Sequence, residues 1–273
     1  MNLTSKKIIR SLLKKNNIQP SKRLGQNFLV NKKVLADIIT AAEISSKDII
    51  LEIGPGLGVL TKELALRAKK VIAVEKDERM IKILKKALSS YQNIKLIHAD
   101  ILRLPDPKIK NYKVIANLPY YIVAPVIRKF LEAKLPPKSM VLMVQKEVAQ
   151  RICAKPPHMN LLSVSVQFYA EPKIIRYVKR TSFWPQPKVD GAIIKIVPSR
   201  KYVSQVNPQK FFKIVHAGFS HPRKQLVNNL SRHLHLDRST TEKWLLKNGV
   251  QPSQRAETVS VESWISLTRD KIY

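Results

Sequence analysis

The strongest constraint on the fold is an alternation of short apolar runs with segments of helical periodicity through the first two-thirds of the chain. The apolar runs are rich in β-branched residues on both faces, which is typical of strands in a covered parallel sheet. Between the first three runs, residues 59–68 and 78–90 space their apolar residues as one face of a helix. This βαβαβ order predicts an α/β fold with a doubly wound, Rossmann-like sheet. The predicted strands are residues 49–54, 71–75, 94–100, 113–117, 140–145 and, later in the chain, 191–197.

The pattern changes after Pro198. Helical periodicity then dominates, and we expect four short helices at 208–220, 223–234, 239–250 and 260–273. We therefore predict two domains. The first is an α/β domain over residues 1–199 with a basic N-terminal segment at 1–21, and the second is a small all-α domain over residues 200–273. Residues 163–170 fit both the strand period and the helix period, so their state stays open.

Lysine and arginine outnumber the acidic residues by 50 to 19, which gives a formal net charge of +31. A surplus of this size indicates a polyanionic partner, and nucleic acid is the simplest one. The first acidic residue is Asp37, and Asp190 is the only acid between Pro172 and Leu236. We expect a moderately charged core flanked by two basic arms, although a generally basic surface would have the same composition.

The single cysteine, Cys153, excludes an internal disulfide and is typical of a reducing compartment. The apolar runs fall far short of the ~20 residues that a membrane-spanning helix needs. We expect a globular, cytoplasmic protein that does not use a membrane. The first 20 residues lack acids, as organelle transit peptides do, but they lead almost directly into the GQNFL sequence at 25–29, which favours a basic helix.

A glycine-rich sequence, EIGPGLG, joins the first predicted strand to the first helix. Gly54, Gly56 and Gly58 allow a ligand to approach the backbone closely, although such a loop can also simply turn the chain. Glu75 ends the next strand, where a carboxylate can accept hydrogen bonds from both hydroxyls of a ribose. The pair indicates a nucleoside cofactor, and both NAD and S-adenosylmethionine fit it.

The next two strand ends favour S-adenosylmethionine. Asp100 can accept a hydrogen bond from an adenine amino group while Ile101 covers the ring; the alternative for Asp100 is the N-cap of a following helix. The fourth strand ends in the sequence NLPY, residues 117–120.

The NLPY sequence suits an amine that is a poor nucleophile. The exocyclic nitrogen of adenine shares its lone pair with the ring, and Asn117 Oδ1 and the Leu118 carbonyl are two acceptors that could hold it closer to tetrahedral. Pro119 forces an extended conformation on Leu118 and donates no N–H, and Tyr120 offers a face on which an unstacked base can lie. The alternative is a turn that ends the strand and packs a tyrosine.

Other chemistry-bearing residues have simpler interpretations. His233 and His235 lack carboxylate or cysteine partners, so we expect no metal site. Cys153 has no setting typical of a nucleophile and is interpreted as a small buried residue. Phe183 and Trp184 either stack on RNA or pack the joint between the two predicted domains.

Together these sequences resemble the ribosomal RNA adenine dimethyltransferases, close to the bacterial small-subunit (16S) enzymes. The resemblance covers nearly the whole chain. It is carried by KRLGQNFL (22–29), EIGPGLGVLT, VIAVEKD, HADIL, NLPYYI, MVQKEVAQRI, FWPQPKVDGAI, RKQLVNNL and RAETVSVE (255–262).

The resemblance implies transfer of four methyl groups from S-adenosylmethionine to N6 of two adjacent adenosines near the 3′ end of small-subunit rRNA. The implied partner is the immature small subunit, with no metal or membrane, and we expect a monomer. The residues that would hold the target adenine are 117–120. The cofactor contacts would be Asn27, Leu29, Gly54, Gly56, Glu75, Asp100, Ile101 and Asn117, and the substrate RNA contacts would be Tyr120, Phe183, Arg223 and Lys224.

The chain departs from the family pattern at Tyr121–Val123, at Met159–Leu161, and at Pro222, where an arginine is usual. Three other functions stay open. The protein could act mainly as an assembly factor that binds immature subunits, or methylate an adenine of large-subunit rRNA. An NAD-dependent oxidoreductase would use Gly54 and Glu75 but would leave NLPY and the basic arms without a role.

Overall fold

A computed structural model describes residues 3–21 and 23–270, and the chain divides into two compact units. Unit 1 comprises residues 1–149 and 173–198, and unit 2 comprises residues 150–172 and 199–273. The predicted boundary near residue 199 separates the last strand from the C-terminal helices. The structure differs from the prediction at residues 150–172, which group with those helices and not with the sheet.

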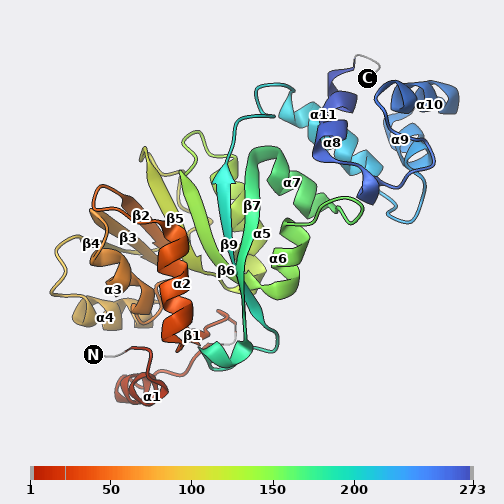
Figure 1. Ribbon diagram of the computed structural model, residues 1–273. Helices are drawn as coiled ribbons and strands as arrows, with labels where there is room; N and C mark the ends of the chain where they lie inside the picture. The colour runs from red at the N-terminus through yellow and green to blue at the C-terminus, as the bar shows by residue number, and fades with distance from the viewer. Residues whose placement is uncertain (1–2, 22, 271–273) are drawn as a thin grey trace. The chain divides into compact units, whose positions relative to one another are not determined.

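The sheet has seven strands in the order β4-β3-β2-β5-β6-β9-β7 (Figure 1). The first five of these strands are parallel, and β9 runs antiparallel to β6. Each of the six predicted strands is present within a few residues of its expected limits. These six are β2 (Ile49–Ile53), β3 (Lys70–Glu75), β4 (Ile94–His98), β5 (Tyr112–Asn117), β6 (Ser139–Gln145) and β9 (Gly191–Pro198). The seventh strand, β7 (Ala170–Val178), was not predicted.

The chain reverses its direction of travel across the sheet between β2 and β5. From β2 it proceeds outward through β3 and β4, and it then returns to pair β5 with the other side of β2. In open α/β sheets, ligands bind at the carboxyl ends of the strands where the strand order reverses. This topology places the ends of β2 and β5 side by side at such a point.

Helices connect and cover the strands of unit 1. They are α1 (Lys6–Lys15), α2 (Lys32–Ala42), α3 (Val59–Ala65), α4 (Glu78–Ala87), α5 (Val123–Leu131) and the first residues of α6 (Lys146–Ile152), whose last three residues are counted in unit 2. Buried side chains of α2 and α3, such as Ile38 and Leu64, share one hydrophobic core with Ile50, Ile115 and Ile193 of the sheet. A second small sheet pairs β1 (Phe28–Leu29) with β8 (Phe183–Trp184), and short 3-10 turns occupy η1 (Tyr120–Ile122) and η2 (Arg180–Ser182).

Unit 2 is helical and has its own core. Its elements are α7 (Leu161–Tyr169), α8 (Pro208–Gly218), α9 (Leu226–Leu234), α10 (Arg238–Lys247), η3 (Ala256–Thr258) and α11 (Val261–Arg269). Residues 163–170, which the sequence left undecided, are helical except for Ala170. Phe168 of α7 stacks on Phe211 of α8 with ring centroids 4.2 Å apart, so burial of this aromatic side chain explains why 150–172 belongs to this unit. None of the helices in the described part of the chain is long and apolar enough to cross a membrane.

Candidate active site

A cavity in unit 1 lies at the carboxyl ends of β2, β3 and β5, where the topology predicts a ligand site. Its walls combine the glycine loop, the residues that follow β3, β4 and β5, and an N-terminal arm at residues 24–29. Every predicted cofactor residue lines this cavity. These residues are Asn27, Leu29, Gly54, Gly56, Glu75, Asp100, Ile101 and Asn117.

The glycine loop is built from left-handed backbone. Gly54, Gly56 and Gly58 have φ values of 67°, 58° and 83°, which residues other than glycine rarely adopt. Gly58 directly precedes α3, and a Cβ there would approach Leu84 Cδ2 to 3.0 Å. The loop therefore needs glycine both for its turn and for its close packing on α4.

Glu75 is held against this loop. One of its carboxylate oxygens accepts the Gly56 N–H at 3.1 Å and the other accepts the Asp77 N–H at 2.8 Å. Burial raises the pKa of Glu75 above its usual value, against the lowering effect of these hydrogen bonds. Each oxygen has a further lone pair, so the carboxylate can still accept hydrogen bonds from a ligand.

Asp100 combines two of the expected roles. It lines the cavity, and its Oδ2 accepts a hydrogen bond from Lys76 Nζ at 2.8 Å. Its Oδ1 accepts the Leu102 N–H at 3.0 Å and so caps a turn, where the alternative interpretation expected a helix. The hydrogen bond from Lys76 lowers the pKa of Asp100, and Ile101 is buried beside it.

Asn117 ends β5 with its side-chain amide fixed. Its Nδ2 donates to the main-chain oxygen of Asn27 at 3.1 Å, which leaves Oδ1 without a hydrogen-bond partner among residues 3–21 and 23–270. The Leu118 N–H donates to the Met143 carbonyl at 3.2 Å, while the Leu118 carbonyl accepts no hydrogen bond within the same residues. The two acceptors expected from the sequence therefore belong to neighbouring residues that line one cavity.

The rest of the NLPY sequence is extended and then turns. Pro119 has φ −57° and ψ 136°, and η1 follows it. Leu118 and Pro119 line the cavity together with Tyr121, whose side chain is exposed. The side chain of Tyr120 lies outside the described part of the structure, so its stacking role stays a prediction.

Gly25 and Gln26 belong to the N-terminal arm that lines the cavity, and each contacts another segment of the cavity wall or its support. The sequence analysis gave neither residue a role. Gly25 has φ 61°, and a Cβ on it would lie 3.0 Å from Pro119 Cβ. Gln26 Nε2 donates to Asp77 Oδ2 at 2.8 Å, and Asp77 is the N-cap of α4. Asp77 stands two residues after Glu75, directly before the predicted helix at 78–90. This position could have identified it from the sequence as the N-cap of that helix.

Glu52 was also missed. It lines the cavity from β2 and is almost fully buried, and its Oε2 has no hydrogen-bond partner among the residues described. Burial raises the pKa of Glu52 to about 8, so this carboxyl group is mainly protonated at neutral pH. Its place at the start of EIGPGLG, in an otherwise apolar strand, was the available sequence signal.

The predicted RNA contacts are divided between the two units. Phe183 is 4% exposed and packs in the core of unit 1, with its strand β8 paired to β1, so the structure favours packing over stacking on RNA for this ring. Arg223 and Lys224 are exposed in unit 2, in the loop between α8 and α9.

The other candidates from the sequence are unexceptional. Burial raises the pKa of the half-buried Cys153 thiol to about 11, which disfavours the thiolate form. Across the described residues, no three His, Cys, Asp or Glu side chains come close enough to hold a metal ion.

One cavity is thus lined by the glycine loop and by Glu75, Asp100 and Asn117, the residues that the resemblance implied as cofactor contacts. A family model described as ribosomal RNA adenine dimethylase matches residues 17–271. This chain belongs to the ribosomal RNA adenine dimethylase family.

Relatives within this family are similar over nearly their full length. A protein of Dehalococcoides mccartyi named ribosomal RNA small subunit methyltransferase A is 46% identical over 255 residues, which cover 92% of this chain and 88% of the relative. A Bacillus cereus protein of the same name is 41% identical over 273 residues, which cover 95% and 94% of the two chains.

Solved structures agree with the family assignment. The crystal structure of a dimethyladenosine transferase from Plasmodium falciparum has a TM-score of 0.76 at 30% identity and covers 88% of this chain and 95% of its own. The crystal structure of the 23S rRNA methyltransferase ErmE has a TM-score of 0.74 at 28% identity and covers 89% and 98%. The predicted α/β methyltransferase fold with a C-terminal helical region is confirmed.

Proposed function

We propose that this protein uses S-adenosylmethionine to dimethylate N6 of two adjacent adenosines near the 3′ end of small-subunit (16S) rRNA. The curated relatives at 46% and 41% identity are named as small-subunit enzymes. The large-subunit enzyme among the solved structures is 28% identical. This difference supports the small subunit over the large-subunit alternative.

The groups that line the cavity suit S-adenosylmethionine. The left-handed glycines leave the loop backbone open to a ligand, and Glu75 retains lone pairs for the two ribose hydroxyls. Asp100 and the buried Ile101 suit an adenine edge and face. Among the described residues that line the cavity, Lys76 is the only cation, and it is neutralised by Asp100, so no free positive charge would repel a sulfonium.

The observation that carries the proposal is a pair of acceptors on the wall of this cavity, Asn117 Oδ1 and the Leu118 carbonyl, which accept no hydrogen bond from the described residues. When bound, the cofactor would supply an electrophilic methyl group for transfer to the adenine N6, and the proton that N6 loses would pass to solvent. The two oxygens would accept hydrogen bonds from the N6 amino group and so orient the nitrogen lone pair. They would also stabilise the positive charge that develops on this nitrogen. Asn117 and Leu118 each donate a hydrogen bond to another segment of unit 1, through the Asn117 side-chain amide and the Leu118 N–H. The two acceptor oxygens are therefore held in place and need little reorganisation during the reaction.

The test is methyl transfer to small ribosomal subunits that lack the dimethyladenosines. Purified protein is incubated with methyl-labelled S-adenosylmethionine, and the rRNA is cut with a base-specific ribonuclease so that tandem mass spectrometry of the fragments locates each modified base. We expect N6,N6-dimethyladenosine at two adjacent positions, and no incorporation into subunits that already carry the modification. Folded protein that binds the cofactor but leaves unmodified subunits unlabelled would overturn the proposal.

The charge of the chain also supports a second function, binding of immature subunits as an assembly factor. A net charge of +31 would favour such binding whether or not methyl transfer follows. A variant without methyl transfer that still supports subunit maturation would favour this function. The cytoplasm, as the site of ribosome assembly in bacteria, stays our predicted location, and a monomer stays our predicted state.

A further inference from the structure

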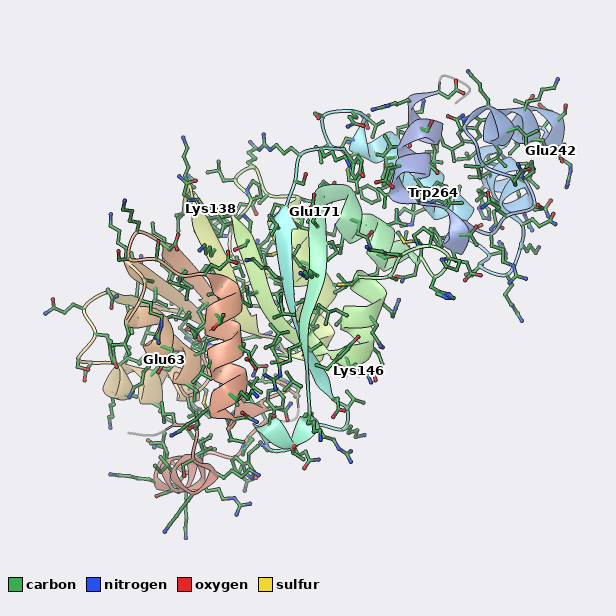
Figure 2. All side chains as sticks on the ribbon, viewed as in Figure 1. Glu63, Lys138, Lys146, Glu171, Glu242 and Trp264 are labelled. Carbon is green, nitrogen blue, oxygen red and sulfur yellow. The ribbon has the colours of Figure 1, made fainter. Side chains whose placement is uncertain are left out.

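One face of α1 carries a cluster of cations with no acidic partner among the residues that the structure describes. Lys6, Lys7, Arg10, Lys14 and Lys15 are all exposed on this ten-residue helix. Within the described part of the chain, none of the five forms an ion pair. Figure 2 shows long nitrogen-tipped side chains that extend from α1 away from the rest of unit 1.

These charges are not explained by helix stability. Lys6 and Lys7 stand in the first turn, where the helix has no acidic residue and Ser5 makes no side-chain cap. Positive charge at a helix N-terminus opposes the helix dipole. Lys14 and Lys15 occupy the favourable last turn, so the first-turn lysines in particular need another reason.

The helix is anchored on the wall of the candidate active site. Its buried residues Ile9 and Leu13 share a hydrophobic cluster with Leu57 of the glycine loop and Met80 of α4. The Arg10 guanidinium lies 5.4 Å from the ring centroid of Trp184, a distance typical of a cation–π contact.

Trp184 connects this contact to the cavity. It pairs with Phe28 across β1 and β8, and Phe28 lines the cavity. The basic side of α1 is therefore fixed to the same residues that enclose the cofactor and target sites.

We propose that the basic face of α1, defined as Lys6, Lys7, Arg10, Lys14 and Lys15, binds the phosphate backbone of the rRNA that carries the target adenosines. This inference rests on the proposed function and adds an RNA-binding surface to it. A ten-residue helix is about 15 Å long, which is long enough to contact more than one consecutive phosphate of an RNA strand. Anchoring the backbone here holds the substrate strand beside the cavity while the adenine enters it.

The test variant is Lys6→Gln/Lys7→Gln/Lys14→Gln. This variant keeps the contact of Arg10 with Trp184. It removes two unfavourable charges from the N-terminus of the helix and one favourable charge from its C-terminus, so α1 should remain folded. The matched control is Lys108→Gln/Lys110→Gln/Lys138→Gln. These three lysines are exposed, and Lys110 and Lys138 flank the amino ends of β5 and β6, opposite the cavity; Figure 2 labels Lys138 at that end.

The measurement is the association constant for unmethylated small subunits between 50 and 200 mM salt. For three lost phosphate contacts, we expect at least tenfold weaker binding near 100 mM and a log–log salt slope that is shallower by about 2–3. The control should stay within about twofold of the wild type, and both variants should bind S-adenosylmethionine normally. If the triple variant melts early, the Lys6→Gln/Lys7→Gln pair carries the same test with a slope change of about 1–2.

Equal binding by the test variant and the control would overturn the proposal. So would a defect in binding phosphatidylserine vesicles without any defect in binding subunits, because the occupant would then be a membrane. The outcome is separate from that of the proposed function. A wild-type protein that fails to methylate, but whose subunit binding depends on α1, would overturn only the proposed reaction.

Discussion

The side-chain amide of Asn117 is tied to the main-chain oxygen of Asn27, a residue 90 positions earlier, by a hydrogen bond of 3.1 Å. This bond uses the amide nitrogen, so the oxygen is the part of the side chain that remains for a substrate. It also connects the end of β5 to the N-terminal arm that lines the cavity. One contact therefore fixes both the orientation of the candidate catalytic acceptor and the position of the arm.

Asn117→Ala should reduce kcat for methyl transfer by about 100- to 1000-fold while the Kd for S-adenosylmethionine changes by less than about fivefold. Loss of one acceptor aimed at a developing charge has effects of this size. Asn117→Asp keeps an oxygen but loses the donor to Asn27, so it separates the two functions of the side chain. Single-turnover kinetics and equilibrium dialysis give the two quantities, and equal losses of binding and turnover in Asn117→Ala would show that the side chain serves binding only.

Gly25→Ala should lower methyl transfer by about tenfold or more. Its φ of 61° is unfavourable for alanine, and the new Cβ would lie 3.0 Å from Pro119 Cβ, which would displace either the arm or the NLPY segment. The matched control is Gly249→Ala in unit 2, where φ is 70° and no atom lies within 4 Å of the added Cβ. Both variants should lose about 1–2 kcal/mol of stability, but only Gly25→Ala should lose activity; equal activity in the two would remove the arm from the site.

The strands and the polar residues at their ends were predictable because parallel strands bring their carboxyl ends to one edge. Local patterns did not decide residues 163–170, whose helix begins at Asn160, where Asn160 and Ser163 form a reciprocal capping box. This also gives a structural reason for Asn160, one of the departures from the family pattern. The contact of Gly25 with Pro119 and the grouping of Phe168 with Phe211 join residues far apart in sequence, and no local period reports them.

Because of Glu52, the free energy of unfolding should depend on pH at pH values above those at which carboxylates usually titrate. Its ordinary pKa is 4.5 and burial raises it to about 8 in the folded protein, so the folded state holds a proton that the unfolded state has released between these values. Stability therefore falls as pH rises through this window and levels off above it, with a slope of at most about 1.4 kcal/mol per pH unit.

The variant Glu52→Gln cannot titrate, so its stability relative to the wild type should increase from about pH 5 to about pH 8 and then stay constant. Denaturant unfolding at several pH values measures this difference. Glu147→Gln is the matched control for the substitution itself, because Glu147 is exposed on α6. A difference between Glu52→Gln and the wild type that does not vary with pH would mean that Glu52 is ionised in the folded protein.

Gly218→Ala should destabilise unit 2, because this glycine ends α8 directly against Trp264 of α11. A Cβ there would lie 2.3 Å from Trp264 Cη2 and 3.1 Å from Leu226 Cδ1, and Trp264 is fully buried, so the ring has no room to move away. Overpacking of this kind costs about 1–3 kcal/mol or more. In a Trp264→Phe background the clashing ring atoms are absent, so the same substitution should cost at least about 1 kcal/mol less. Thermal unfolding of the four proteins of this cycle measures the coupling, and an additive result would show that α8 and α11 do not meet at this point.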